Sequence, residues 1–284
     1  MLTTTLQRSI LVILPALVFA VLPSLSQADH SWGAYHWART ANPFVLKIGD
    51  NLTSITWKSK LTQSAQDWNS PGVFTSTSPL LTAVVAGRAG SRCAMVAGTS
   101  QVCNGYYGKN GWLGLATINI INGTHITQGS AKMNDSYFST FKYNNPNEKL
   151  HVMCQEIAHT FGLNHQSTNG SSQNSCMDYF SNTGAYAAST LSTKPNLHDF
   201  EQLNIIYTHL DSMTTLSAMA FFAASASEQT DDPKNWGQLR SQSYNGRSST
   251  YEKYNSGGTQ TVTHVYWTAE AAANCRRCDH RYDH

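Results

Sequence analysis

Four residues near the middle of the chain have the types and the spacing of a metal site with a catalytic base. The segment CQEIAHTFGLNH contains Glu156, His159, Gly162 and His165 at successive intervals of three residues. On a helix, a side chain one turn before His159 faces the same ion, and Glu156 points beside it towards water at an open coordination position. Zinc with three protein ligands lowers the pKa of that water towards about 7, so that a carboxylate can take its proton. These residues therefore indicate hydrolysis by an activated water.

The residue one turn before His159 is Gln155, where this pattern places an imidazole. An amide oxygen is a weaker zinc donor than an imidazole nitrogen. Three outcomes are open: Gln155 ligates through its oxygen, Tyr179 or a water completes the set, or the site is inactive. His151 lies a further turn up the helix, about 12 Å along the axis from His159, and is too far away to share one ion with it.

Gly162 and the segment SCMDY complete a recognisable combination. Gly162 lets the helix stop and the chain reverse, because glycine adopts left-handed dihedrals at little cost, and this returns His165 as a ligand. SCMDY places Met177 shortly after His165. Taken together, the two stretches resemble the metzincin clan of metallopeptidases, whose H-E-x-x-H-x-x-G-x-x-H signature is followed by a Met-turn. The match covers roughly 25 residues directly and departs at Gln155.

The resemblance implies an α+β fold and a secreted zinc endopeptidase acting on protein or peptide substrates. The fold would be metzincin-like, with a twisted mixed β-sheet, backing and active-site helices, and a small lower subdomain. Zn²⁺ would be bound by Gln155, His159 and His165, with Glu156 as the general base. Tyr179 matches a tyrosine that reaches the metal or the oxyanion in the astacin-like and serralysin-like branches. The alternatives are a secreted binding protein that kept the cleft without turnover, hydrolysis of a non-peptide amide, and a helix with incidental histidines.

The first 28 residues have the pattern of a signal peptide. Arg8 supplies a positive charge, an apolar run covers 10–22, and Ser26-Gln27-Ala28 offers small residues for cleavage. The run is too short for a comfortable membrane span. We therefore expect a secreted, extracellular chain that begins near Asp29 and does not bind a membrane after cleavage.

Composition and cysteine count agree with export. Charged residues make up 13% of the chain and the formal net charge is +2, with no basic cluster suited to a nucleic-acid backbone. An even number of cysteines in an exported chain predicts disulfides. Cys93 and Cys103 could pair locally, and a Cys154–Cys176 bond would tie the active-site helix to the Met-turn, with Cys154 as a zinc ligand the less favoured alternative. The terminal Cys275 and Cys278 form a C-x-x-C, which favours a disulfide or a disordered tail over a second metal site.

Hydrophobic periodicity predicts the elements that position these residues. We expect strands at 44–49, 80–85, 112–121 and 125–133, a hairpin around 93–103, and helices over 57–68, from Pro146, and over 197–210. Strand 112–121 would form the sheet edge above the cleft, where extended substrate pairs with the main chain. His198 and His209 are expected at the surface or at helix caps.

The sequence predicts a chain in three parts. The signal peptide covers 1–28, a metzincin-like catalytic domain covers 29–212, and a linker with a small β-rich C-terminal appendage covers 213–284. Within the appendage, Thr250 to Thr268 has the pattern of two strands around Ser256-Gly257-Gly258, which is typical of a hairpin.

Overall fold

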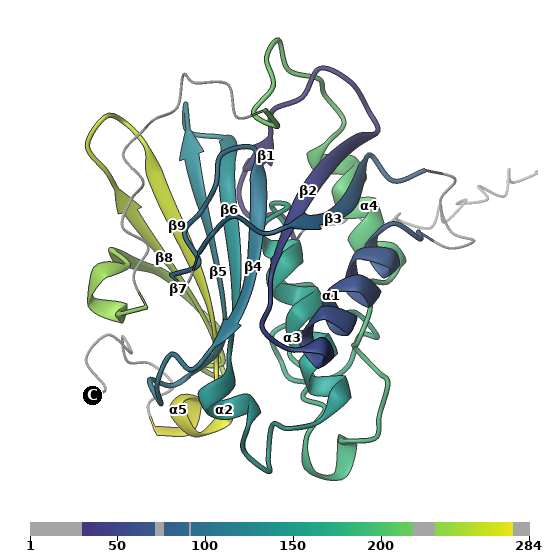
Figure 1. The fold of residues 1–284 in the computed structure, drawn as a ribbon, viewed down its shortest axis with the longest axis vertical. Helices are drawn as coiled ribbons and strands as arrows, with labels where there is room; N and C mark the ends of the chain where they lie inside the picture. Colours follow the sequence, from purple (N-terminus) through teal and green to yellow (C-terminus); the bar gives the residue numbers. More distant parts are fainter. Residues whose placement is uncertain (1–29, 72–76, 91, 218–230, 275–284) are drawn as a thin grey trace, which may run out of the picture.

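The computed structural model of the protein describes residues 30–71, 77–90, 92–217 and 231–274. The predicted signal peptide and the Cys275/Cys278 pair lie outside these residues. The described chain forms an α+β fold around one large mixed sheet, with strand order β3-β2-β4-β6-β5-β9-β8-β7 and β1 paired to β6 at one end (Figure 1).

The first half of the sheet is parallel. It contains β1 (His36–Trp37), β2 (Phe44–Asn51), β3 (Leu80–Ala86), β4 (Thr99–Gly105) and β6 (His125–Asn134). The second half is antiparallel and contains β5 (Trp112–Ile121), β7 (Gln238–Gln242), β8 (Ser248–Tyr254) and β9 (Gln260–Trp267). Strands β5 and β9 are buried along their whole length, because both faces of the sheet are covered there.

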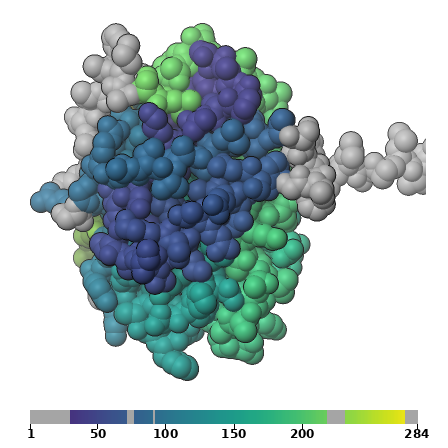
Figure 2. Space-filling view, turned by 45° about the vertical axis from the view of Figure 1, so that its right-hand side comes forward, coloured from purple at the N-terminus to yellow at the C-terminus, as the bar shows by residue number. Residues whose placement is uncertain are grey.

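The helices are α1 (Ile55–Trp68), α2 (Asp135–Phe138), α3 (Pro146–His159), α4 (Leu197–Ile206) and α5 (Ala269–Asn274), with short 3-10 turns at Gly184–Tyr186 and Pro233–Asn235. Helices α1, α3 and α4 lie together on one side of the sheet (Figure 1). Figure 2 turns this side forward and shows the purple-to-blue residues around α1 in front of the molecule. Helix α3 lies between α1 and strands β5 and β6, so its residues from Leu150 to His159 are all buried.

The ends of α3 follow from its sequence. Asn145 caps the helix by accepting hydrogen bonds from the amides of Asn147 and Glu148, and Pro146 stands at the first turn, where its missing N–H costs nothing. The chain turns at Gly162, which has a φ of +97°. A Cβ at this position would lie 2.2 Å from the carbonyl oxygen of Tyr35. Only glycine therefore allows both the turn and this close approach.

Two local expectations from sequence are wrong. Residues 93–103 do not form a hairpin: Thr99–Gly105 is β4, which lies between β2 and β6 and runs parallel to both. The strand at 112–121 is not a sheet edge, because β9 pairs along its free side. Local patterns identify strands but not their neighbours, and here the neighbour comes from the far end of the chain.

The C-terminal strands expected as an appendage are part of the central sheet. The hairpin of β8 and β9 forms around residues 256–258 as predicted, but β9 pairs with β5 from Gln260 to Trp267. The sequence of a hairpin does not show whether the hairpin stands apart or joins a larger sheet, because any unpaired strand edge can accept a partner. Within the described residues, no helix is long and apolar enough to cross a membrane.

Candidate metal centre

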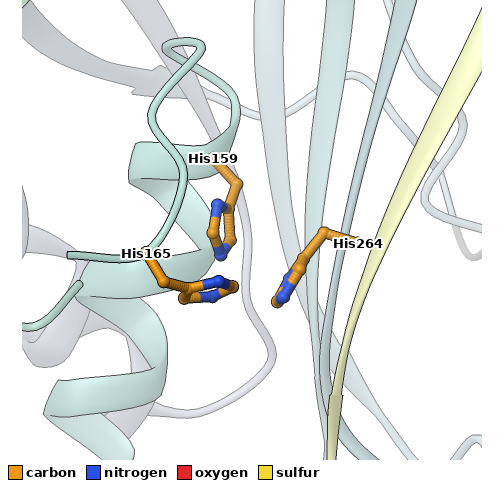
Figure 3. A group of neighbouring side chains, drawn as sticks. All are labelled: His159, His165 and His264. Carbon is orange, nitrogen blue, oxygen red and sulfur yellow. The ribbon is translucent and has the colours of Figure 1, made fainter. Parts of the chain in front are cut away.

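Three histidines from three different elements converge beside α3. His159 is the last residue of α3, His165 lies in the loop that follows Gly162, and His264 comes from β9 (Figure 3). One ligand nitrogen of each ring lies within 4.8 Å of the others. The ring centroids are 3.9 Å apart for His159 and His264, and 4.6 Å apart for each of the other two pairs. We call these three residues the central group.

The hydrogen bonds of the central group leave two nitrogens free to bind an ion. His159 Nδ1 lies 2.9 Å from the carbonyl oxygen of Leu163, which fixes the proton on Nδ1 and leaves the Nε2 lone pair available. Nε2 of His159 and Nε2 of His165 are both buried without a hydrogen-bond partner. Unpartnered buried nitrogens are costly, and a metal ion would satisfy them.

Burial keeps these imidazoles neutral, which is the form that binds metal. Desolvation lowers the pKa of His159 to about 3, and it lowers the pKa of His165 and of His264 well below the usual range. The neighbouring imidazoles of the group add to the lowering at His165 and His264. No proton therefore competes with a cation for the lone pairs near neutral pH.

Glu156 lies against the same space, where a glycine on β5 makes room for it. Its Oε2 is 3.5 Å from His264 Nδ1, and its Oε1 is buried without a hydrogen-bond partner. A Cβ on Gly114 would lie 2.4 Å from Glu156 Oε1 and 2.7 Å from Val152 Cγ1. Desolvation raises the pKa of Glu156 well above its usual range, and a cation beside it would act in the opposite direction.

Tyr179 contacts two members of the central group, His264 and His165. Its hydroxyl is 3.1 Å from His264 Nε2, and its ring stacks on Tyr266 at a centroid distance of 4.8 Å. The same ring lies 4.5 Å from the ring of His165. Burial raises the pKa of Tyr179 well above its usual range, so the phenol keeps its proton and can donate a hydrogen bond.

Gln155 faces the Met-turn. Its Nε2 donates to the carbonyl oxygen of Cys176 at 2.8 Å and to that of Asp178 at 2.9 Å. Its Oε1 is buried without a hydrogen-bond partner. The side-chain amide of Gln155 thus holds the residues before and after Met177. The carbonyl oxygen of Met177 itself accepts a hydrogen bond from the backbone amide of Gln166 at 2.7 Å.

The Met-turn is held to α3 by further contacts. The Cys154–Cys176 disulfide links the residue before Gln155 to the residue before Met177. His151 bonds the carbonyl oxygen of Asp178 at 3.0 Å through Nε2, which explains its buried position away from the central group. Cys93 and Cys103 form the second disulfide of the described residues, so both of the pairs that spacing suggested are present.

The N-terminal segment closes one side of the central group. The Trp32 amide donates to the carbonyl oxygen of Gly162 at 2.7 Å, and the Asn164 amide donates to that of His30. The Trp32 ring, which is buried, lies 5.4 Å from His159 and 6.1 Å from His264. His165 is the partly exposed member of the group.

His264 is the member that the sequence did not predict. It lies on the inward face of β9 with Val262 and Tyr266, opposite Ala116 on β5. Two features of the sequence could have indicated His264 as a ligand. It stands at an alternating apolar position in a predicted strand, and the motif lacks one imidazole. The hairpin pattern predicts the two strands but not which of their faces points inward.

Comparison with known proteins does not assign a function. No protein-family model matches the chain, and no curated protein matches its sequence. Among solved structures the chain is similar to myroilysin, at 13% sequence identity and a TM-score of 0.36, over 64% of this chain and 99% of myroilysin. Because this likeness is so distant, the function has to be argued from the residues of the site.

Proposed function

We propose that this protein is a zinc-dependent endopeptidase whose metal is held by His159, His165 and His264. The observation that carries the proposal is the convergence of these three neutral imidazoles, two of them with unpartnered Nε2 atoms, next to a buried carboxylate. Three nitrogen donors with no protein carboxylate among them suit zinc and leave a coordination position open. When bound, zinc supplies Lewis-acid activation of a water and of the scissile carbonyl.

Glu156 is the residue that moves the proton. Its carboxylate takes a proton from the attacking water, and the same proton then passes to the nitrogen of the leaving amine as the peptide bond breaks. Its place against Gly114 holds it beside the central group and keeps bulk water away. Away from bulk water, the Glu156 carboxyl would stay ionised and available as a base if a cation occupied the central group.

Tyr179 and the partly exposed His165 mark the side from which substrate approaches the central group. Tyr179 is a protonated phenol next to His264, and it donates a hydrogen bond to the oxyanion that forms from the carbonyl. His159 and His264 are buried, so a peptide reaches the group from the side of His165. The substrate class we propose is protein or extended peptide.

We also propose that the protein is exported from the cell. Two disulfides in the described residues fit an oxidising compartment. We propose that the segment 1–28 is removed, so that sequencing of the secreted protein starts near Asp29. A secreted form that begins at Met1 would contradict this.

A protease assay with metal analysis tests the proposed function. The purified protein should contain zinc at the central group and digest casein or gelatin, lose activity with a chelator, and regain it with added zinc. Metal-loaded, folded protein that cleaves no protein substrate would contradict the enzyme and favour a secreted binding protein with the same cleft. Metal-free folded protein that still digests casein would contradict the role of zinc.

A further inference from the structure

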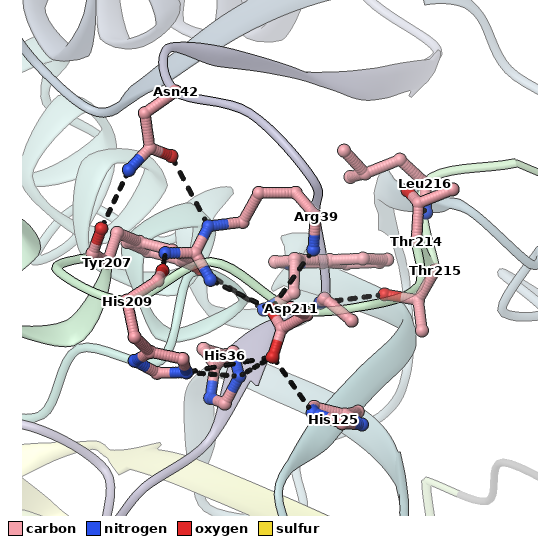
Figure 4. A network of polar contacts seen from close by, with 12 residues as sticks. His36, Arg39, Asn42, His125, Tyr207, His209, Asp211, Thr214, Thr215 and Leu216 are labelled. Carbon is pink, nitrogen blue, oxygen red and sulfur yellow. Dashed lines mark hydrogen bonds and ion pairs between the residues drawn. The ribbon is translucent and has the colours of Figure 1, made fainter.

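A second group of ligand-type side chains lies where the N-terminal strand meets the loop after α4. His36 is in β1, His125 begins β6, and His209 and Asp211 follow α4 (Figure 4). Strand β1 pairs with β6 so that His36 stands directly beside His125. We call these four residues the outer group. None of them belongs to the motif or to the central group.

One donor atom each of His36, His209 and Asp211 lies within 4.8 Å of the other two, and His125 contacts the same carboxylate. Asp211 Oδ1 lies 3.3 Å from His36 Nε2, 3.3 Å from His125 Nε2 and 3.7 Å from His209 Nε2. His36 Nε2 and His209 Nε2 are 3.2 Å apart. Tetrahedral zinc with bonds of about 2.0–2.1 Å has donors about 3.3–3.4 Å apart. The spacing of His36, His209 and Asp211 therefore fits three corners of a tetrahedral site, and His125 is the neighbouring residue that can supply the fourth ligand.

The contacts behind these donors orient them towards a cation. Asp211 Oδ2 accepts from the Arg39 amide at 3.1 Å and from Arg39 Nη1 at 2.9 Å, so Oδ1 is the oxygen left for the histidines. His36 Nδ1 lies 2.8 Å from the carbonyl oxygen of Ala34. This bond puts the proton of a neutral His36 on Nδ1, so its Nε2 lone pair faces Asp211 and His209.

In the absence of an ion, neutral tautomers can share these atoms, with His209 Nε2 donating to His36 Nε2 and His125 Nε2 donating to Asp211 Oδ1. In this state His36 Nε2 still faces Asp211 Oδ1 at 3.3 Å, which brings two acceptors together, and a cation between them would turn this contact into two metal–ligand bonds. Protonating several of these imidazoles would place further positive charges next to the Arg39 guanidinium, which is unfavourable. A single divalent ion satisfies the donors of His36, His209 and Asp211 at once, with His125 beside Asp211 to complete the set. We propose that the outer group binds a zinc-class divalent transition-metal ion as a closed, structural site.

The site would join three separate segments of the chain. It would fasten β1 to the start of β6 and to the loop after α4, through residues that are far apart in sequence. β1 continues the segment that carries Trp32 over the central group, so the ion would hold this cover in place. A pocket of about 440 Å³ lined by His36, His125 and His209 gives an ion a path to the donors.

Counting zinc in matched variants tests the proposal. After chelator treatment and dialysis, the secreted wild-type protein is titrated with zinc against a colorimetric chelator. We expect two ions per chain in the wild type and one in His125→Asn/His209→Asn. We also expect one in His159→Asn/His165→Asn, which removes the central group. His198→Asn, which removes a histidine from α4 outside both groups, should keep two.

A stability readout distinguishes the outer site from the proposed activity. In the His159→Asn/His165→Asn background, zinc should raise the Tm of unfolding, and adding His209→Asn should remove that rise; the His209 side chain is 54% exposed, so this variant should fold. If the central group binds no metal, the wild type would hold one ion that only the outer-group variants lose. The proposal is overturned if His125→Asn/His209→Asn binds as much zinc as the wild type, or if zinc leaves the Tm of the central-group variant unchanged.

Discussion

The central and outer groups differ in donor set and in surroundings. The central group has three imidazoles and no carboxylate ligand, with Glu156 beside it and two nitrogens without partners. The outer group has three imidazoles and Asp211, whose other oxygen is held by Arg39. Catalytic zinc sites keep one position open and structural sites fill all four. In the functions that we propose, imidazoles therefore serve chemistry in the central group and hold chain segments together in the outer group.

The largest expected effect is the loss of the base at the central group. Glu156→Gln should lower kcat by a factor of about 10² to 10⁴ while zinc content stays the same, because the amide cannot accept the proton. Glu201→Gln on α4 is the matched control and should retain activity. Full activity in the Glu156 variant would show that the carboxylate is not the base.

The Cys154–Cys176 disulfide should stabilise the fold and also support the central group, whereas Cys93–Cys103 should only stabilise the fold. Removing Cys154–Cys176 with Cys154→Ala/Cys176→Ala should lower the free energy of unfolding by about 3 kcal/mol, because the unfolded chain loses a constraint. Chemical denaturation measures this. The Cys93–Cys103 bond closes a shorter loop, with a separation of 10 residues against 22, so Cys93→Ala/Cys103→Ala should cost somewhat less. Only the first variant should also weaken zinc binding at the central group; equal zinc affinity in both would contradict a role of the bond in the site.

The glycine beside the base gives a smaller effect. Gly114→Ala should destabilise the fold by about 1–3 kcal/mol and lower kcat, because the new Cβ pushes against Glu156 and Val152. Gly105→Ala on β4 is the control, since its Cβ meets the side chain of Tyr107 at 3.3 Å and can be accommodated. Denaturation and peptidase assays measure the two effects. An active, equally stable Gly114 variant would show that Glu156 is not positioned by this contact.

The smallest expected effect comes from restoring the missing imidazole of the motif. If Gln155 were the third ligand, Gln155→His would tighten zinc binding by one or two powers of ten, at about 1.4 kcal/mol each. The amide of Gln155 instead donates to the carbonyl oxygens of Cys176 and Asp178. We expect a change in zinc affinity of less than about tenfold, measured by competition with a chelating dye. A clear gain would return Gln155 to the ligand set.

Local features of the site were readable from sequence. The helix start at Pro146, the turn at Gly162 and the spacing of Glu156, His159 and His165 depend on residues within a few turns of each other. Strands β2, β3, β5 and β6 and helices α1, α3 and α4 follow their hydrophobic periods for the same reason. These elements are fixed by nearby residues, so one sequence suffices to find them.

Contacts between distant segments were not readable. His264 lies 108 residues after Glu156, and its position depends on β9 pairing with β5 in one register. The residues next to His209 in the sequence are typical of a surface position. Its neighbour His36 is far away in the sequence, and only the fold, with β1 paired to β6, brings His36 and His125 near it. Without covarying relatives, nothing in either segment specifies its partner. The sequence therefore located His159 and His165 of the central group and no member of the outer group.

The zinc affinity of a His264 variant shows whether His264 is the third ligand of the central group. In a His125→Asn/His209→Asn background, which leaves one group, His264→Asn should weaken zinc binding by at least about 100-fold, as loss of a direct ligand requires. Gln155→Leu in the same background should weaken it far less. A cooperative thermal unfolding transition in both variants is the control that they are folded. Unchanged affinity in His264→Asn together with a large loss in Gln155→Leu would contradict the three-histidine site and support Gln155 as the ligand.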